Sequence, residues 1–119
     1  MFSGIVEDAA LVTAIEKEQE NLHITLKCSF VNDLKIDQSI AHNGVCLTVV
    51  KLLDDTYTVT AISETLQKTN LGLLKVGDKV NVERSMTINS LLDGHLVQGH
   101  VDQTARCTEI KESDGSWYY

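Results

Sequence analysis

Apolar and polar residues alternate with a period of two along most of the chain. The alternation is strictest in residues 23–28 and 79–83, and β-branched or aromatic side chains fill residues 45–50 and 56–62. Both patterns are typical of β-strands. Asn43-Gly44 stands just before one of these segments, and it predicts a tight hairpin because both residues tolerate positive φ. The pattern therefore predicts a series of short antiparallel strands.

Only residues 63–67 favour a helix, with the Ser63 hydroxyl as an N-cap and Gly72 as a stop signal. Many short strands, almost no helix and no proline indicate an all-β fold. A small closed barrel satisfies this pattern and leaves no exposed sheet edge. A β-sandwich fits the pattern nearly as well. The barrel is predicted to occupy residues 1–92.

The beginning of the chain is repeated near its end, 95 positions later. Five of the 14 positions from Gly4 to Lys17 are identical to their counterparts, against about one by chance. The identical pairs are Gly4 and Gly99, Val6 and Val101, Ala10 and Ala105, Thr13 and Thr108, and Ile15 and Ile110. Residues 93–119 are thus expected to be the truncated start of a second copy, too short to close a barrel by itself.

Composition narrows the possible partners. A formal net charge of −7 disfavours nucleic acid and anionic membranes, which would be repelled. This also argues against a nucleic-acid-binding barrel. Three cysteines without paired spacing form neither a disulfide framework nor a zinc motif. With no signal peptide pattern and no apolar run of roughly 20 residues, a cytoplasmic location is expected.

Four motifs follow one another along the chain and are specific as a set. They are MFSGIVE at 1–7, AHNGVCLTV at 41–49, ETL and TNLG between 64 and 72, and GHLVQGHV at 94–101. Together with the repeat, they resemble the riboflavin synthase alpha chain family from Met1 to the last residue. The resemblance implies two tandem six-stranded antiparallel Greek-key barrels, followed by a helix that holds a trimer. It implies a homo-oligomer: a trimer at full length, with a dimer as the alternative for this chain.

The resemblance also implies an activity. Each barrel would bind one molecule of 6,7-dimethyl-8-ribityllumazine, and the first barrel of one subunit would face the second barrel of a neighbour. A four-carbon unit would pass between the two lumazines, giving riboflavin and 5-amino-6-ribitylamino-pyrimidinedione, without a metal or an organic cofactor. The alternative is a non-catalytic lumazine- or flavin-binding protein of the same fold.

A flat bicyclic ligand with a polyol tail needs an apolar slot and a few well-placed polar groups. Gly4 and Gly99 allow close approach of the backbone, and Thr48 and Thr60 supply hydroxyls among apolar neighbours. The resemblance adds an N-terminal phenylalanine that reaches the active site. The predicted substrate-binding residues are Phe2, Gly4, Ile5, Val6, Cys46, Leu47, Thr48, Thr60, Ala61, Ile62, Ser63, Glu64, Thr65, Gly99 and Val101.

Two residues are predicted to be catalytic, His100 and Ser39, because they match family positions with polar or proton-transfer roles. A neutral imidazole suits removal of a proton from the C7 methyl of the donor lumazine. Cys46 lies in an apolar strand and is interpreted as a wall residue; its neighbour is Val45 where some relatives carry a second cysteine. His95 would face away from His100 on a predicted strand, which disfavours a metal site.

Overall fold

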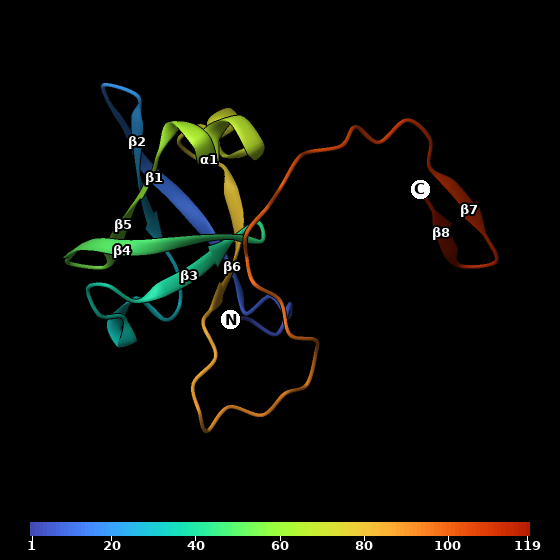
Figure 1. Ribbon diagram of the computed structural model, residues 1–119, viewed down its shortest axis with the longest axis horizontal. Helices are drawn as coiled ribbons and strands as arrows, with labels where there is room; N and C mark the ends of the chain where they lie inside the picture. Colours follow the sequence, from blue (N-terminus) through green and yellow to red (C-terminus); the bar gives the residue numbers. More distant parts are fainter.

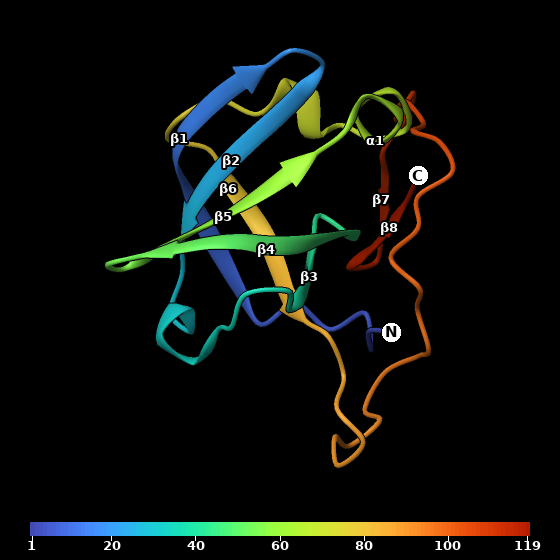
Figure 2. The same cartoon turned by 60° about the vertical axis from the view of Figure 1, so that its left-hand side comes forward.

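Six antiparallel strands form a closed barrel in the computed structural model, which describes residues 1–119 (Figures 1 and 2). The order around the barrel is β1-β2-β5-β4-β3-β6, and β6 pairs with β1 to complete it. Closure confirms the barrel and excludes the sandwich. The strands are β1 (Asp8–Glu18), β2 (Asn21–Lys27), β3 (Ser39–His42), β4 (Val45–Leu53), β5 (Thr56–Ala61) and β6 (Lys79–Arg84).

The connections make a Greek key, because β3, β4 and β5 follow one another as hairpins while β2 lies beside β5. The predicted hairpin between β3 and β4 is confirmed. Asn43 and Gly44 adopt φ values of 49° and 83°, the left-handed pair that matches the twist of the flanking strands.

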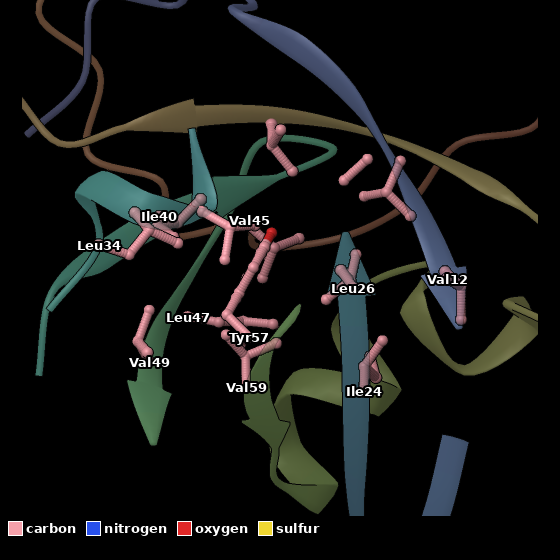
Figure 3. Packing of buried hydrophobic residues seen from close by; sticks show 14 of the residues in the cluster. Val12, Ile24, Leu26, Leu34, Ile40, Val45, Leu47, Val49, Tyr57 and Val59 are labelled. Carbon is pink, nitrogen blue, oxygen red and sulfur yellow. The ribbon is translucent and has the colours of Figure 1, made fainter. Parts of the chain in front are cut away.

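The barrel interior is filled by the side chains that point inward from alternate positions of the strands (Figure 3). Along β5, Tyr57, Val59 and Ala61 are fully buried, whereas the alternate threonines are only partly buried. This division follows from the period-two alternation of side chains in a strand. Each fully buried aliphatic side chain contributes about 1.5–3 kcal/mol relative to an exposed one. The threonine face of β5 remains available on the outside.

Two 3₁₀ turns and one short helix close the barrel ends: η1 (Val31–Asp33), η2 (Leu71–Leu73) and α1 (Ser63–Lys68). The predicted helix is therefore confirmed, but Ser63 is its first residue rather than its cap. The cap position is Ile62, which is extended because β5 runs almost directly into the helix. Instead of capping, the Ser63 hydroxyl accepts a 3.3 Å hydrogen bond from Gln67. No helix is long and apolar enough to cross a bilayer.

One polar pair lies inside the otherwise apolar barrel. His42 is 2% exposed, with Nε2 at 2.9 Å from the Tyr57 hydroxyl and Nδ1 at 3.0 Å from the Ile40 carbonyl. Burial lowers the pKa of His42 to about 4 and raises the pKa of Tyr57. The ring is therefore neutral near pH 7: Nδ1–H donates to Ile40, and the Tyr57 hydroxyl donates to Nε2.

After β6 the chain leaves the barrel and has little regular secondary structure before Lys111. The strand expected around His95 and His100 does not form; Val97 alone makes a β-bridge, to Phe2. Gly99 has φ of +84°, outside the β region, so a regular strand cannot continue through it. Residues from Asp102 onward are exposed, and they end in a separate hairpin of β7 (Lys111–Ser113) and β8 (Ser116–Tyr118), away from the barrel in Figure 1.

The backbone repeats with the same 95-residue offset as the sequence. Pairing in the terminal hairpin, Ser113 with Ser116, has the register of Glu18 with Asn21 at the β1–β2 turn. The first turn residue of each hairpin, Gln19 or Asp114, is left-handed, with φ of 54° and 50°. Phe2 and Val97, also 95 residues apart, exchange N–H to carbonyl hydrogen bonds of 2.8 and 2.9 Å. The repeat thus extends beyond the positions that are identical.

Candidate functional site

A cavity of about 310 Å³ lies on the outer side of the barrel, where the start of β4 meets α1 and residues 99–102. Its walls therefore come from both sequence repeats. The lining residues are Val45, Cys46, Glu64, Thr65, Lys68, Thr69, Gly99, His100, Val101 and Asp102. Six of them were predicted from the sequence as substrate-binding or catalytic residues.

Gly99 attaches the far wall of this cavity to the barrel. Its carbonyl accepts a 2.8 Å hydrogen bond from the Cys46 N–H, and Val101 packs against the hydrophobic core. A Cβ atom at Gly99 would lie 2.9 Å from Cys46 Cβ and 2.9 Å from Cε2 of Phe2. Only glycine therefore allows this approach, and the left-handed φ of +84° adds a second requirement for it.

Gly99→Ala is expected to lower stability by about 1–3 kcal/mol, because the new methyl group crowds two side chains in a strained backbone conformation. Gly44→Ala is the matched control, since Gly44 has nearly the same φ, +83°, but no atom within 4 Å of an added Cβ. Urea unfolding of both variants separates crowding from backbone strain. Equal losses at the two positions would contradict the tight contact at Gly99.

The helix and Thr69 directly after it supply most of the charged and hydroxyl groups of the cavity. Lys68 Nζ lies 2.8 Å from Glu64 Oε1, an i,i+4 pair on one side of α1. The hydrogen bond from Lys68 lowers the pKa of Glu64, and the same bond raises the pKa of Lys68, so both are charged near neutral pH. The Thr69 hydroxyl donates to the Thr65 carbonyl at 2.8 Å. Polar groups thus surround one side of the cavity.

Four lining residues were missed from the sequence: Val45, Lys68, Thr69 and Asp102. Lys68 could have been found, because it lies one helical turn after the predicted Glu64. Asp102 directly follows the predicted 99–101 stretch. Val45 is inward-facing in β4 and carried no separate signal.

Alternation along the strands divides the predicted stretches. Leu47 and Ala61 face inward and belong to the hydrophobic core, 6% and 0% exposed. Thr48 is exposed on the outer face, and the half-buried Thr60 hydroxyl is 2.8 Å from Nδ1 of His23. Ile62 is half exposed. None of these five predicted residues, nor Ser63, lines the 310 Å³ cavity.

The N-terminal residues lie behind the cavity rather than in it. Phe2, Gly4 and Val6 line a small cavity of about 80 Å³ on the other side of Gly99. Ile5 borders an open depression of about 440 Å³ beside Glu83 and Arg84.

The two predicted catalytic residues occupy different surroundings. His100 is exposed and lines the 310 Å³ cavity, whereas Ser39 lines none of the three cavities described above. Ser39 pairs with Thr48 in the β3–β4 ladder, and its carbonyl accepts a hydrogen bond from Ser85. Within this chain, the structure therefore offers one imidazole and no serine partner for it at the cavity.

The cavity combines a small apolar wall with several hydrogen-bonding groups. Val45 and Val101 provide apolar wall, while Thr65, Glu64 and Lys68 provide donors and acceptors. No group of three histidine, cysteine, aspartate or glutamate side chains is arranged to hold a metal ion.

Comparison of the sequence with known proteins identifies one family model and a group of similar proteins. The family model of the lumazine binding domain matches residues 3–85. The riboflavin synthase of Bacillus subtilis is 41% identical over 120 residues, covering 100% of this chain and 56% of the relative. That of Mycobacterium tuberculosis is 46% identical over 113 residues, covering 90% of the chain and 56% of the relative. The chain thus spans about half the length of these curated relatives.

Similarity extends to solved structures. LumP complexed with riboflavin aligns with a TM-score of 0.83 at 27% identity, over 96% of this chain and 62% of that one. LumP complexed with 6,7-dimethyl-8-(1'-D-ribityl) lumazine also gives a TM-score of 0.83 at 27% identity, covering 96% of this chain and 64% of the other. The agreement covers nearly the whole described chain.

Proposed function

Because this chain belongs to the lumazine binding domain family, we propose that it forms the first barrel of a riboflavin synthase, with residues 93–119 beginning a second repeat. Identity of about 40% to riboflavin synthases over the whole chain supports the enzyme. The shared offset in sequence and backbone supports the second repeat, since the terminal hairpin repeats the register of the first.

The ligands are 6,7-dimethyl-8-ribityllumazine and riboflavin, and they bind in the 310 Å³ cavity. The observation that carries this proposal is the meeting of residues from both repeats at one cavity, with Cys46 and Thr65 on one side and Gly99 and Val101 on the other. The apolar walls suit the ring system. The hydroxyl and charged groups of α1 suit the ribityl tail.

The reaction is the transfer of a four-carbon unit between two lumazines. His100 is the proposed proton acceptor for the C7 methyl, because its exposed imidazole borders the cavity. Ser39 acts, in this proposal, on a ligand held between this barrel and another. No step needs a metal ion or an organic cofactor.

Riboflavin titration tests the binding site. We expect a saturable change in flavin fluorescence when the chain is added, and roughly fivefold weaker binding for Lys68→Ala, which removes one ligand-facing hydrogen-bond donor. Lys27→Ala is the control, because Lys27 forms an exposed ion pair with Asp55 and lines none of the described cavities. Absence of saturable binding up to the solubility of riboflavin would show that the proposed function is wrong.

A second candidate is a non-catalytic carrier of the same ligands. The observation that favours it is the similarity to LumP over 96% of the chain, since both LumP structures hold a riboflavin-related ligand. A carrier and an enzyme are separated by riboflavin formation, measured on the longest form of the protein. Binding without turnover would favour the carrier.

A further inference from the structure

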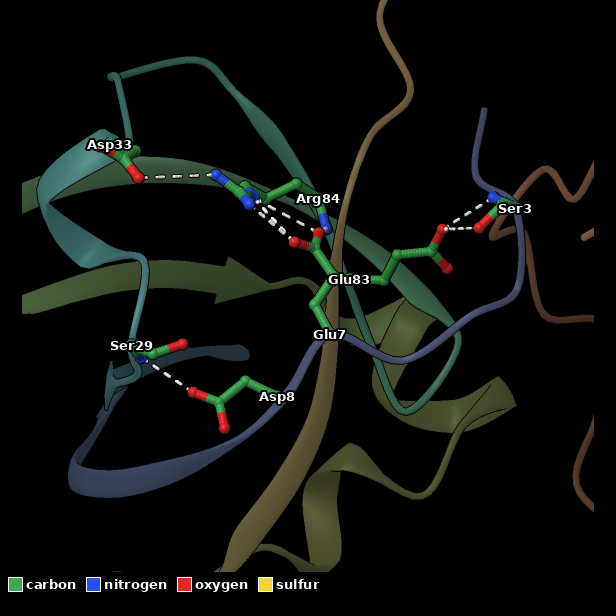
Figure 4. Close-up of polar contacts among 7 residues, drawn as sticks. All are labelled: Ser3, Glu7, Asp8, Ser29, Asp33, Glu83 and Arg84. Carbon is green, nitrogen blue, oxygen red and sulfur yellow. Dashed lines mark hydrogen bonds and ion pairs between the residues drawn. The ribbon is translucent and has the colours of Figure 1, made fainter. Parts of the chain in front are cut away.

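Glu83 is a carboxylate buried at the end of β6, 8% exposed, and its side chain reaches the N-terminal segment (Figure 4). Oε2 accepts hydrogen bonds from the Ser3 N–H at 2.7 Å and the Ser3 hydroxyl at 2.9 Å. Oε1 accepts from the Gly4 N–H at 3.0 Å. A buried carboxylate is costly unless it is satisfied in this way, so all three bonds fix the position of Ser3 and Gly4.

The shape of the N-terminal segment fits a carboxylate. The successive N–H groups of Ser3 and Gly4, with Gly4 in the left-handed conformation at φ of +84°, form a small concave site for an anion. The nearby Glu7 carboxylate has another partner, because Arg84 Nη2 lies 2.7 Å from its Oε2. Figure 4 shows the two carboxylates directed to these different partners. Glu83 is therefore the only carboxylate that holds Ser3.

Direct contacts continue from Ser3 to the wall of the cavity. The Ser3 carbonyl accepts a 2.8 Å hydrogen bond from the His95 N–H, and Phe2 exchanges two backbone hydrogen bonds with Val97. The buried Phe2 ring then lies against Gly99, whose carbonyl is bonded to Cys46 in β4. Hydrogen bonds and van der Waals contacts thus connect Glu83, through the N-terminal segment, to Gly99.

We propose that Glu83 is a positioning residue for ligand binding: through Ser3 and Phe2 it holds the 99–101 wall of the cavity against β4. The inference rests on the proposed function and deepens it, because it assigns a role to a residue that does not line the 310 Å³ cavity. Loss of the carboxylate is therefore expected to loosen the 99–101 wall and to leave the barrel unchanged.

The test compares Glu83→Ala, Glu83→Gln and the matched control Glu7→Gln. We expect Glu83→Ala to raise the riboflavin Kd roughly tenfold, because the loss of hydrogen bonds to a charged group typically has an effect of this size. Glu83→Gln should weaken riboflavin binding less than Glu83→Ala, since the amide keeps one carbonyl oxygen as a hydrogen-bond acceptor. Glu7→Gln removes an ion pair elsewhere, so it should lower the Tm and leave the Kd unchanged.

A deletion of residues 2–4 distinguishes positioning from general stability. In that background Glu83→Ala should have no further effect on the Kd, because the segment through which Glu83 acts is missing. A lower Tm with an unchanged Kd for Glu83→Ala in the full chain, or an equal effect in the deleted chain, would overturn the inference.

A second measurement tests the role of Glu83 even if the proposed function is wrong. If the unmodified chain does not bind riboflavin, the amide resonances of Gly99 and His100 decide the role of Glu83 in the free protein. Shifts of both resonances in Glu83→Ala, absent in Glu7→Gln, support positioning of the wall. Unchanged resonances contradict it.

Discussion

The 119-residue chain, assayed alone, is expected to form riboflavin at least roughly a thousandfold more slowly per binding site than a full-length riboflavin synthase. The proposed reaction joins two lumazines, so both must be held together in a productive orientation. Such orientation is worth on the order of 7–11 kcal/mol at best, and losing about 4 kcal/mol of it already slows the reaction a thousandfold. The chain provides one complete barrel and spans 56% of its Bacillus subtilis relative.

The measurement is riboflavin formation from ribityllumazine, followed by absorbance, for the chain and for the Bacillus subtilis enzyme side by side. Riboflavin binding by the same preparation is the control, since it shows that the barrel is folded and the cavity intact. If the chain matches the longer enzyme in rate per site, two first barrels suffice and the argument for a second repeat in catalysis is wrong.

Stability is expected to fall by about 3 kcal/mol between neutral pH and pH 4 because of His42. The folded protein keeps this buried ring neutral down to a pKa of about 4, whereas the unfolded chain binds the proton near the ordinary value of 6.5. The full contribution is therefore present above pH 6.5 and is lost as the pH falls toward 4. Protonation would leave the Tyr57 hydroxyl facing a donor instead of an acceptor.

Urea unfolding at intervals between pH 7 and pH 4.5 isolates this effect. The carboxylates of Glu7, Asp8, Asp55 and Glu64 have lowered pKa values, so their contributions are lost at the acid end of the scale, below the window chosen. His42→Leu removes the titrating group and should flatten the profile above pH 4.5, although it also leaves Tyr57 without its acceptor. A slope that persists in this variant would assign the pH dependence to another group.

Local patterns predicted the fold well because each strand needed only its own residues. The Asn43-Gly44 turn and the alternation along β5 required no knowledge of distant partners. Closure of the barrel did need such knowledge, since the pairing of β1 with β6 joins residues about 70 positions apart. The strand expected near His95 failed because the left-handed Gly99 interrupts it.

Site residues were predicted as continuous stretches, whereas successive side chains of a strand point to opposite faces of the sheet. Cys46 faces the cavity while Leu47 faces the core, and Ala61 is likewise buried. Lys68 was missed although its helical spacing from Glu64 was visible in the sequence. Glu83 carried no sequence signal, because its role depends on a segment 80 residues earlier in the chain.

The mutual hydrogen bonds of Phe2 and Val97 have a consequence for the origin of the repeat. Each residue occupies the same place in its own copy, and each gives its N–H to the carbonyl of the other, as equivalent residues do across a two-fold axis in a symmetric dimer. In a dimer of identical chains such an isologous contact is self-complementary, so one mutation changes both halves at once. Tandem duplication of a gene for a single barrel could therefore keep such a contact intact while turning two chains into one.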